Sequence, residues 1–135
     1  MHHILEVRTR GKGLYPFTRE VAAWVASTKA ETGLLTLFIQ HTSASLVIQE
    51  NADPDVVLDL ADFFERIAPE NYGYRHDTEG PDDMPAHIRT ALTTVNLSIP
   101  LNRGKLVLGT WQGIYLWEHR GIPHSRKVAM HIIGS

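Results

Sequence analysis

The chain has 135 residues, of which 43% are hydrophobic, and this is enough for one globular domain with a buried core. Its formal net charge of −2 provides no general basic field, so we expect no binding to nucleic acid or to an anionic membrane, and the absence of cysteine excludes disulfides, thiolate metal sites and cysteine nucleophiles. No apolar run approaches the roughly 20 residues that cross a bilayer, and the first residues lack the features of a signal peptide, so we expect a soluble cytoplasmic protein.

The first part of the chain predicts alternating strands and helices. Residues 3–9 have the bias of a strand, and Pro16 opens a helical pattern that continues to Thr28. Residues 34–40 are apolar on both faces, which is typical of a central strand covered on both sides. A second strand, 45–50, follows after a very short connection.

Two further helices begin at aspartate–proline signals. Asp53 and Pro54 form an N-cap and a first helical residue, and the sequence around Asp83 and Pro85 repeats this signal. The remainder predicts strands at 96–101, 105–109, 113–119 and 127–133. We therefore predict a single α+β domain over residues 1–135, with helices covering one face of a mostly antiparallel sheet.

The polar stretch QHTSAS (40–45) lies between two apolar strands, whose ends fix backbone positions well. His41 and Ser43 would share one face of a strand, which suggests a nucleophile and its base. No G-x-S-x-G motif surrounds the serine, so a hydrolase triad has little support. The alternative is a hairpin turn whose hydroxyl groups satisfy the backbone.

The stretch RHDTEGPDDMPAHIR (75–89) contains two histidines. His76 is expected in a loop and His87 in the first turn of a helix, where the helix dipole disfavours a cationic ring and favours a neutral one that binds a metal or an anion. For Asp83 we prefer helix capping. No two histidines lie three or four residues apart, so a metal site would have to be assembled from distant segments.

In LGTWQGIYLWEHR, Gly109 and Gly113 bracket the polar residues 110–112, and such glycines permit close approach of a strand or a ligand. Trp111 could be a core residue or a flat wall for a heteroaromatic ring. The charged residues 118–120 follow, and a charged strand end is their ordinary explanation.

Residues 41–56, 76–88 and 108–120 closely resemble the YjbQ-like family, an uncharacterised family whose members are described as a secondary type of thiamine-phosphate synthase. The resemblance extends from about Glu6 to Gly134. It implies an α+β domain with antiparallel sheets that forms a homotrimer around a threefold axis. It also implies a small phosphorylated substrate, namely a hydroxymethylpyrimidine pyrophosphate that condenses with a thiazole phosphate and releases pyrophosphate.

The resemblance further implies a divalent metal bound by His41, His76 and His87, with His119 a less certain fourth ligand. Three histidines select zinc rather than magnesium, although pyrophosphate chemistry normally uses magnesium. The other implied site residues are Arg120, Thr42 and Ser43 as donors to phosphate, and Thr110, Trp111 and Gln112 around the pyrimidine. Two alternatives stay open: a zinc-dependent hydrolase with Glu79 or Glu118 as general base, and a trimeric metal- or metabolite-binding protein without turnover.

Overall fold

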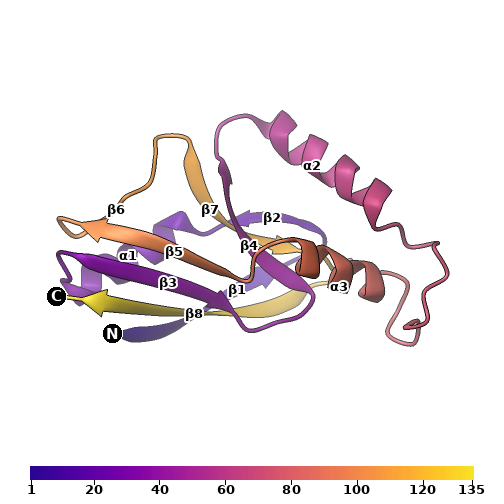
Figure 1. Ribbon diagram of the computed structural model, residues 1–135, viewed down its shortest axis with the longest axis horizontal. Helices are drawn as coiled ribbons and strands as arrows, with labels where there is room; N and C mark the ends of the chain where they lie inside the picture. Colours follow the sequence, from indigo (N-terminus) through magenta and orange to yellow (C-terminus); the bar gives the residue numbers. More distant parts are fainter.

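Two curled antiparallel sheets and three helices make up the computed structural model, which describes residues 1–135 (Figure 1). The helices are α1 (Thr18–Thr28), α2 (Pro54–Ile67) and α3 (Asp83–Leu92). The strands are β1 (His2–Thr9), β2 (Gly13–Pro16), β3 (Gly33–Ile39), β4 (Ala44–Glu50), β5 (Asn96–Asn102), β6 (Lys105–Leu106), β7 (Gln112–Glu118) and β8 (His124–Gly134). This architecture confirms the expected α+β class.

The larger sheet has the strand order β1-β8-β3-β5-β6. Its inner face buries Leu35, Leu37 and Ile39 of β3 against Val21 and Val25 of α1. These side chains are almost fully removed from water, and burial of this kind is the main stabilising contribution to a domain of this size. No helix is both long and apolar enough to cross a membrane.

The smaller sheet has the order β2-β7-β4, and its geometry decides where the candidate site residues lie. Strands β4 and β7 pair from Ala44 opposite Glu118 to Glu50 opposite Gln112. Six residue steps of about 3.3 Å separate the two ends of this pair by about 20 Å. Residues that precede β4 therefore lie far from residues that precede β7.

Helix boundaries follow the sequence signals at α2 and differ at the other two helices. Asp53 caps α2 as expected, because its side chain accepts a hydrogen bond from the backbone N–H of Asp55 at 2.9 Å. Pro16 does not open a helix: it ends the edge strand β2, where a missing N–H is tolerated. Helix α3 begins at Asp83, two residues before Pro85.

Strand β3 is central in its sheet, as expected, but the chain covers only one of its faces. Leu34 and Phe38 point to the other face and are 43% and 48% exposed. Ile4 of β1 and Ile133 of β8 are exposed beside them, because the register places Ala129 between Ile4 and Phe38 and pairs Ile133 with Leu34. We call this apolar surface, formed by Ile4, Leu34, Phe38 and Ile133, the outer face.

Gly33, at the start of β3, should be difficult to replace. Its φ is +155°, and a Cβ atom there would lie 2.5 Å from the carbonyl oxygen of Ile133. We expect Gly33→Ala to lower the free energy of unfolding by about 2–3 kcal/mol, measured by urea denaturation. The cost of a strained backbone conformation adds to the cost of the steric overlap between the new Cβ atom and the backbone. Gly73→Ala is the matched control, since Gly73 has a φ of +87° but no atom near its Cβ direction, and it should cost about 1 kcal/mol. Equal losses in the two variants would show that the overlap at Gly33 is not real.

Candidate metal centre

Two histidines converge on one buried carboxylate at the start of α3. His76, in the loop before α3, places its Nε2 atom 2.7 Å from Oδ2 of Asp83, and His87 places its Nε2 atom 3.2 Å from the same oxygen. The three potential ligand atoms lie within 4.8 Å of one another, which permits coordination of a single ion. His87 follows Asp83 by four residues on α3, so one helical turn aligns these two ligands.

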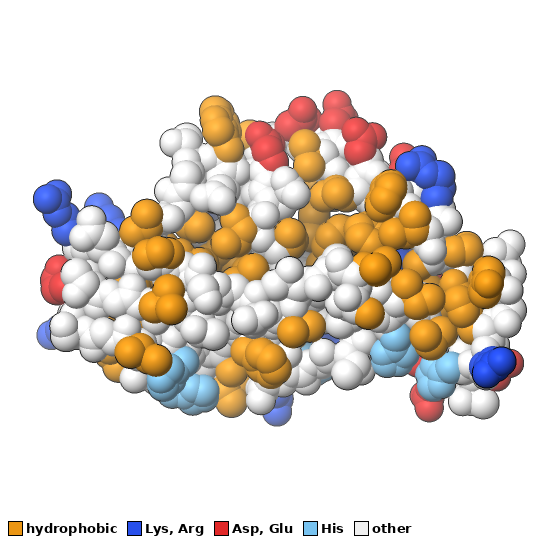
Figure 2. Space-filling model, viewed as in Figure 1, with side chains coloured by type: hydrophobic (Ala, Val, Ile, Leu, Met, Phe, Trp, Pro, Cys, Tyr) orange, Lys and Arg blue, Asp and Glu red, His pale blue; other side chains and the backbone are white.

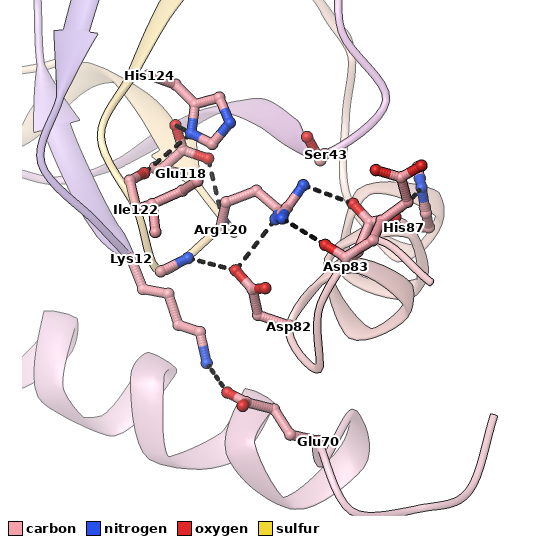
Figure 3. A network of polar contacts seen from close by, with 12 residues as sticks. Lys12, Ser43, Glu70, Asp82, Asp83, His87, Glu118, Arg120, Ile122 and His124 are labelled. Atoms are coloured by element: carbon pink, nitrogen blue, oxygen red, sulfur yellow. Dashed lines mark hydrogen bonds and ion pairs between the residues drawn. The ribbon is translucent and has the colours of Figure 1, made fainter. Parts of the chain in front are cut away.

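Asp83 is an ionised, firmly oriented side chain that is only 5% exposed. Arg120 donates to its Oδ1 atom at 2.8 Å, which leaves Oδ2 to the two imidazoles (Figure 3). Burial raises the pKa of Asp83, but the hydrogen bond from His76 and the charges of His87 and Arg120 outweigh it and lower the pKa below its usual value. The capping interpretation of Asp83 was wrong, because the N-cap residue is Asp82 and Asp83 is the first residue of α3.

The ring of His87 is held in one orientation. Its Nδ1 atom lies 2.9 Å from the carbonyl oxygen of Thr42, and since a carbonyl only accepts, Nδ1 carries a proton and Nε2 is the nitrogen that faces Asp83. This is the usual way in which a protein orients a metal-binding imidazole. Thr42 thus contributes to the site through its backbone and not through its hydroxyl group. A cavity of about 300 Å³ adjoins His76 and is also lined by Tyr74 and Asp77.

His41 lies outside this cluster. Its Nε2 atom accepts a hydrogen bond from the backbone N–H of Lys127 at 2.9 Å, and its Nδ1 atom lies 3.3 Å from Nη1 of Arg126. The lone pair that a metal would need is therefore occupied. Burial and the nearby guanidinium of Arg126 lower the pKa of His41. The structure brings together two histidines and an aspartate, where the sequence analysis expected three histidines.

Glu118 belongs to a buried polar network and is fully buried itself. Arg126 donates to both of its oxygens, Thr9 donates to Oε1 at 2.7 Å, and the backbone N–H of Arg120 donates to Oε2 at 3.1 Å. Arg126 also donates to the hydroxyl of Ser43 at 3.0 Å. Burial raises the pKa of Glu118, but the hydrogen bonds from Arg126 and Thr9 lower it further than burial raises it. With both oxygens occupied, Glu118 is unsuited to act as a general base, and Ser43 is unsuited to bind a substrate.

Arg120 and Glu79 lie beside the cluster. The guanidinium of Arg120 bridges Asp82 and Asp83 and donates to the backbone carbonyl of Glu79 at 3.0 Å, as Figure 3 shows for the two aspartates. Two carboxylates compensate its charge, so Arg120 orients Asp83 and ties the preceding loop to α3. The residue Glu79 is exposed, which leaves its carboxylate open to solvent.

His119 does not join the cluster either. Its ring is 1% exposed and its Nε2 atom lies 2.9 Å from the hydroxyl of Ser45. Burial, reinforced by the charge of Arg89, lowers the pKa of His119 to about 3. The ring is therefore neutral at physiological pH and forms part of the core.

Thr110, Trp111 and Gln112 lie at the opposite end of the β4–β7 pair from Thr42 and Ser43. Trp111 is 63% exposed, which excludes the core alternative. A backbone hydrogen bond holds the loop in place, because the N–H of Asn51 donates to the carbonyl of Trp111 at 3.0 Å. A cavity of about 600 Å³ lies at this end and is lined by residues that include Arg19, Asn51, Gln112 and Tyr115. The expected site residues thus form two groups at the two ends of this strand pair.

Comparison with known proteins places this arrangement in a family. The family model described as UPF0047 protein YjbQ-like matches residues 3–135. The UPF0047 protein sll1880 of Synechocystis is 56% identical over 132 residues, which cover 97% of this chain and 90% of the relative. The UPF0047 protein YjbQ of Escherichia coli O157:H7 is 41% identical over 96% of this chain and 95% of the relative. The crystal structure of the conserved hypothetical protein TT1486 from Thermus thermophilus is 35% identical, with a TM-score of 0.87 over 97% and 99% of the chains. The hypothetical protein APE1520 from Aeropyrum pernix K1 is 26% identical, with a TM-score of 0.91 over 100% and 99%.

The buried ring of His119 should make the fold sensitive to mild acid. An unfolded chain protonates this histidine near pH 6.5, whereas the folded chain does so only near its lowered pKa of about 3. Between pH 7 and pH 5 the unfolded state gains a proton that the folded state does not, so the free energy of unfolding should fall by about 2 kcal/mol from this residue. Urea denaturation at the two pH values should show this loss, and His119→Gln should remove it.

The control for this experiment is His3→Gln, which changes an exposed residue away from the outer face and should leave the pH dependence as in the parent protein. Glu118 affects stability in a different pH range. Its pKa is lowered in the folded state, so its contribution to the free energy of unfolding is lost only when the pH falls below 4.5, the ordinary pKa of a glutamate. An unchanged slope between pH 7 and pH 5 in His119→Gln would contradict the assignment of a neutral buried ring.

Proposed function

The chain belongs to the YjbQ-like UPF0047 protein family, and we propose that His76, Asp83 and His87 bind one divalent metal ion that serves a reaction of a small phosphorylated substrate. The observation that carries this proposal is the convergence of two imidazole Nε2 atoms on one oxygen of a buried, ionised aspartate. Two imidazoles and one carboxylate suit zinc or another transition metal better than magnesium. Three protein ligands also leave at least one coordination position for a substrate oxygen or a water molecule.

The chain's own residues prepare this site before any ligand arrives. Arg120 donates a hydrogen bond to the Oδ1 atom of Asp83, and the carbonyl of Thr42 accepts a hydrogen bond from Nδ1 of His87. Both contacts fix the direction of a ligand lone pair, and loss of such outer contacts typically costs 10–100-fold in metal affinity. We therefore assign Arg120 as a positioning residue, because its guanidinium contacts protein groups on three sides.

The specific reaction that we propose is thiamine-phosphate synthesis, and the support for it is the family resemblance. In this reaction the thiazole nitrogen forms a bond to the methylene carbon of the hydroxymethylpyrimidine, while the bond from that carbon to the pyrophosphate oxygen breaks and the pyrophosphate leaves with the electron pair. The bound metal would supply positive charge to the leaving pyrophosphate. The cavity of about 300 Å³ beside His76 offers space for this group next to the ligands.

A second candidate is hydrolysis of a phosphorylated metabolite. It is favoured by the exposed Glu79, because Arg120 holds the backbone of that residue at the site and its carboxylate is free to accept a proton from water. A third candidate, a metal- or metabolite-binding protein without turnover, shares the same metal site.

Metal analysis of the untagged protein should find one metal ion per chain. His76→Ala, His87→Ala and Asp83→Asn should each lower metal affinity by on the order of 100-fold or more in calorimetric titration, because each removes one of three ligands. His41→Ala is the matched control and should keep the metal, since its Nε2 atom already accepts from Lys127. Retention of metal by the three cluster variants together with its loss in His41→Ala would refute the assignment.

Product assays on the metal-loaded protein then distinguish the three functions. Formation of thiamine phosphate and pyrophosphate from the two precursors, abolished by a chelator and restored by zinc, is the expected result. Phosphate release from phosphoesters that disappears in Glu79→Gln would identify a hydrolase. Absence of both activities would support a metal- or metabolite-binding protein without turnover.

We also propose that the protein is a homotrimer in which the outer face is covered by other copies. The family resemblance suggests the number of subunits. The exposed Leu34 and Ile133, and the exposed Ile4 and Phe38, supply two apolar patches on one face of the larger sheet, separated by the row of Thr36 and His131. Exposed apolar patches of this kind are typical of contacts between proteins.

Light scattering at micromolar concentration should give three times the chain mass of 15.2 kDa. Phe38→Asp should shift this mass towards that of one chain, because a charge would be buried in an apolar contact. Ser27→Asp places the same charge on the exposed side of α1, which packs against the other face of the larger sheet, and should shift the mass much less. A parent protein that runs as a monomer would rule out this assembly.

A further inference from the structure

We propose that the metal centre is one half of a composite site: the Trp111 loop, residues 109–112, of one chain covers the His76–Asp83–His87 cluster of a neighbouring copy. Trp111 would then form the wall against which an aromatic ring of the bound substrate stacks. This inference deepens the proposed function and rests on the metal centre described above.

The first argument is the separation of the two groups within one chain. The loop that carries Trp111 precedes β7, whereas Thr42, which holds His87, precedes β4 at the other end of the same strand pair. About 20 Å of sheet separates these ends. Trp111 therefore cannot contact a substrate bound at the metal centre of its own chain.

The second argument is that the Trp111 loop is rigid although it is exposed. Asn51 donates its backbone N–H to the carbonyl of Trp111 and its side-chain N–H to the carbonyl of Thr110 at 3.4 Å. The side chain of Gln112 accepts from the backbone N–H of Gly109 at 2.8 Å. A tryptophan that is 63% exposed on a fixed loop is organised in advance for a partner and loses little conformational entropy on binding.

The third argument is an uncovered apolar surface beside the metal centre. Helix α2 buries only Phe64, while Leu58, Phe63 and Ile67 are 61%, 46% and 42% exposed. Tyr72, in the loop that leads from α2 to His76, is 74% exposed. Figure 2 shows hydrophobic side chains gathered below α2 and extending towards histidine side chains at the same end of the molecule. A tryptophan from another chain would find apolar contacts here.

The fourth argument is charge complementarity between the two ends. The hairpin between β5 and β6, at the same end as Trp111, exposes Arg103 and Lys105. The exposed side of α2 carries Asp59 and Asp62. A basic surface that meets an acidic surface is a head-to-tail contact, and such contacts between identical chains form a ring when the rotation between copies closes. A second copy of this chain is therefore the occupant that these surfaces fit.

Crosslinking tests the contact without reference to any metal, because the chain has no cysteine of its own. Trp111→Cys chains are mixed with Asp77→Cys chains that carry a different tag, and a short bismaleimide is added. Asp77 is exposed and lines the cavity beside His76, so the expected main product is a dimer that contains both tags. Asp55→Cys, at the far end of α2, is the matched control and should crosslink to Trp111→Cys only at background level.

A fluorescence experiment tests the contact at the metal itself. One chain carries His76→Ala and His87→Ala but keeps Trp111, and the other keeps the metal centre but carries Trp111→Phe. Cobalt(II) added to the mixed assembly should quench Trp111 of the chain that binds no metal. A mixture with Trp111→Phe in both chains gives the background from the other tryptophans.

The outcomes separate this inference from the proposed function. If cobalt does not bind to the chain with the intact cluster, the metal centre fails, and crosslinking alone decides whether the loop covers that place. If cobalt binds but neither quenching nor crosslinking between Trp111→Cys and Asp77→Cys exceeds background, the composite site is overturned. A monomeric mixture overturns it as well.

Discussion

The buried ion pair between Glu118 and Arg126 is the interaction on which the rest of the structure depends. Glu118 ends β7 in the smaller sheet, and Arg126 lies in β8 of the larger one, so the pair joins the two sheets. Both side chains are almost completely buried, which makes an unpaired partner very costly. Removing one member of such a pair typically destabilises a protein by about 3–5 kcal/mol. The hydroxyl groups of Thr9 and Ser43 complete its hydrogen bonds and bring in β1 and the start of β4.

The candidate metal centre is connected to this ion pair through very few hydrogen bonds. Glu118 accepts the backbone N–H of Arg120, whose guanidinium then reaches Asp82 and Asp83. Asp83 in turn receives both histidines. The ligands are therefore supported by a rigid part of the sheets, although His76 itself lies in a loop. Such support is what a binding site needs if the geometry of its side chains is to be kept.

The sequence predicted the elements better than it predicted the site. Two-sided apolarity correctly indicated that β3 is central, and the Asp53–Pro54 signal correctly indicated the start of α2. Asp83 was missed because its role depends on the first residue of α3: a helix that begins at Asp83 aligns it with His87, and a helix that begins at Pro85 does not. Arg120 contacts both residues at that boundary, Asp82 and Asp83, and no local pattern reveals these long-range contacts. The distance of Trp111 from the histidines depends on the β4–β7 register, which is equally invisible in one sequence.

The exposed outer face affects how a newly folded chain behaves. Strand β1 is an edge strand, and its exposed Glu6 and Arg8 discourage other strands from pairing with it. The outer face has no such protection at Leu34 and Phe38. A newly folded chain is therefore protected along its edge strand, whereas its outer face stays open to contact with any apolar surface. Ordered association and aggregation would both begin with an encounter at this face, and exposed hydrophobic surface makes a chain prone to aggregation at micromolar and higher concentrations.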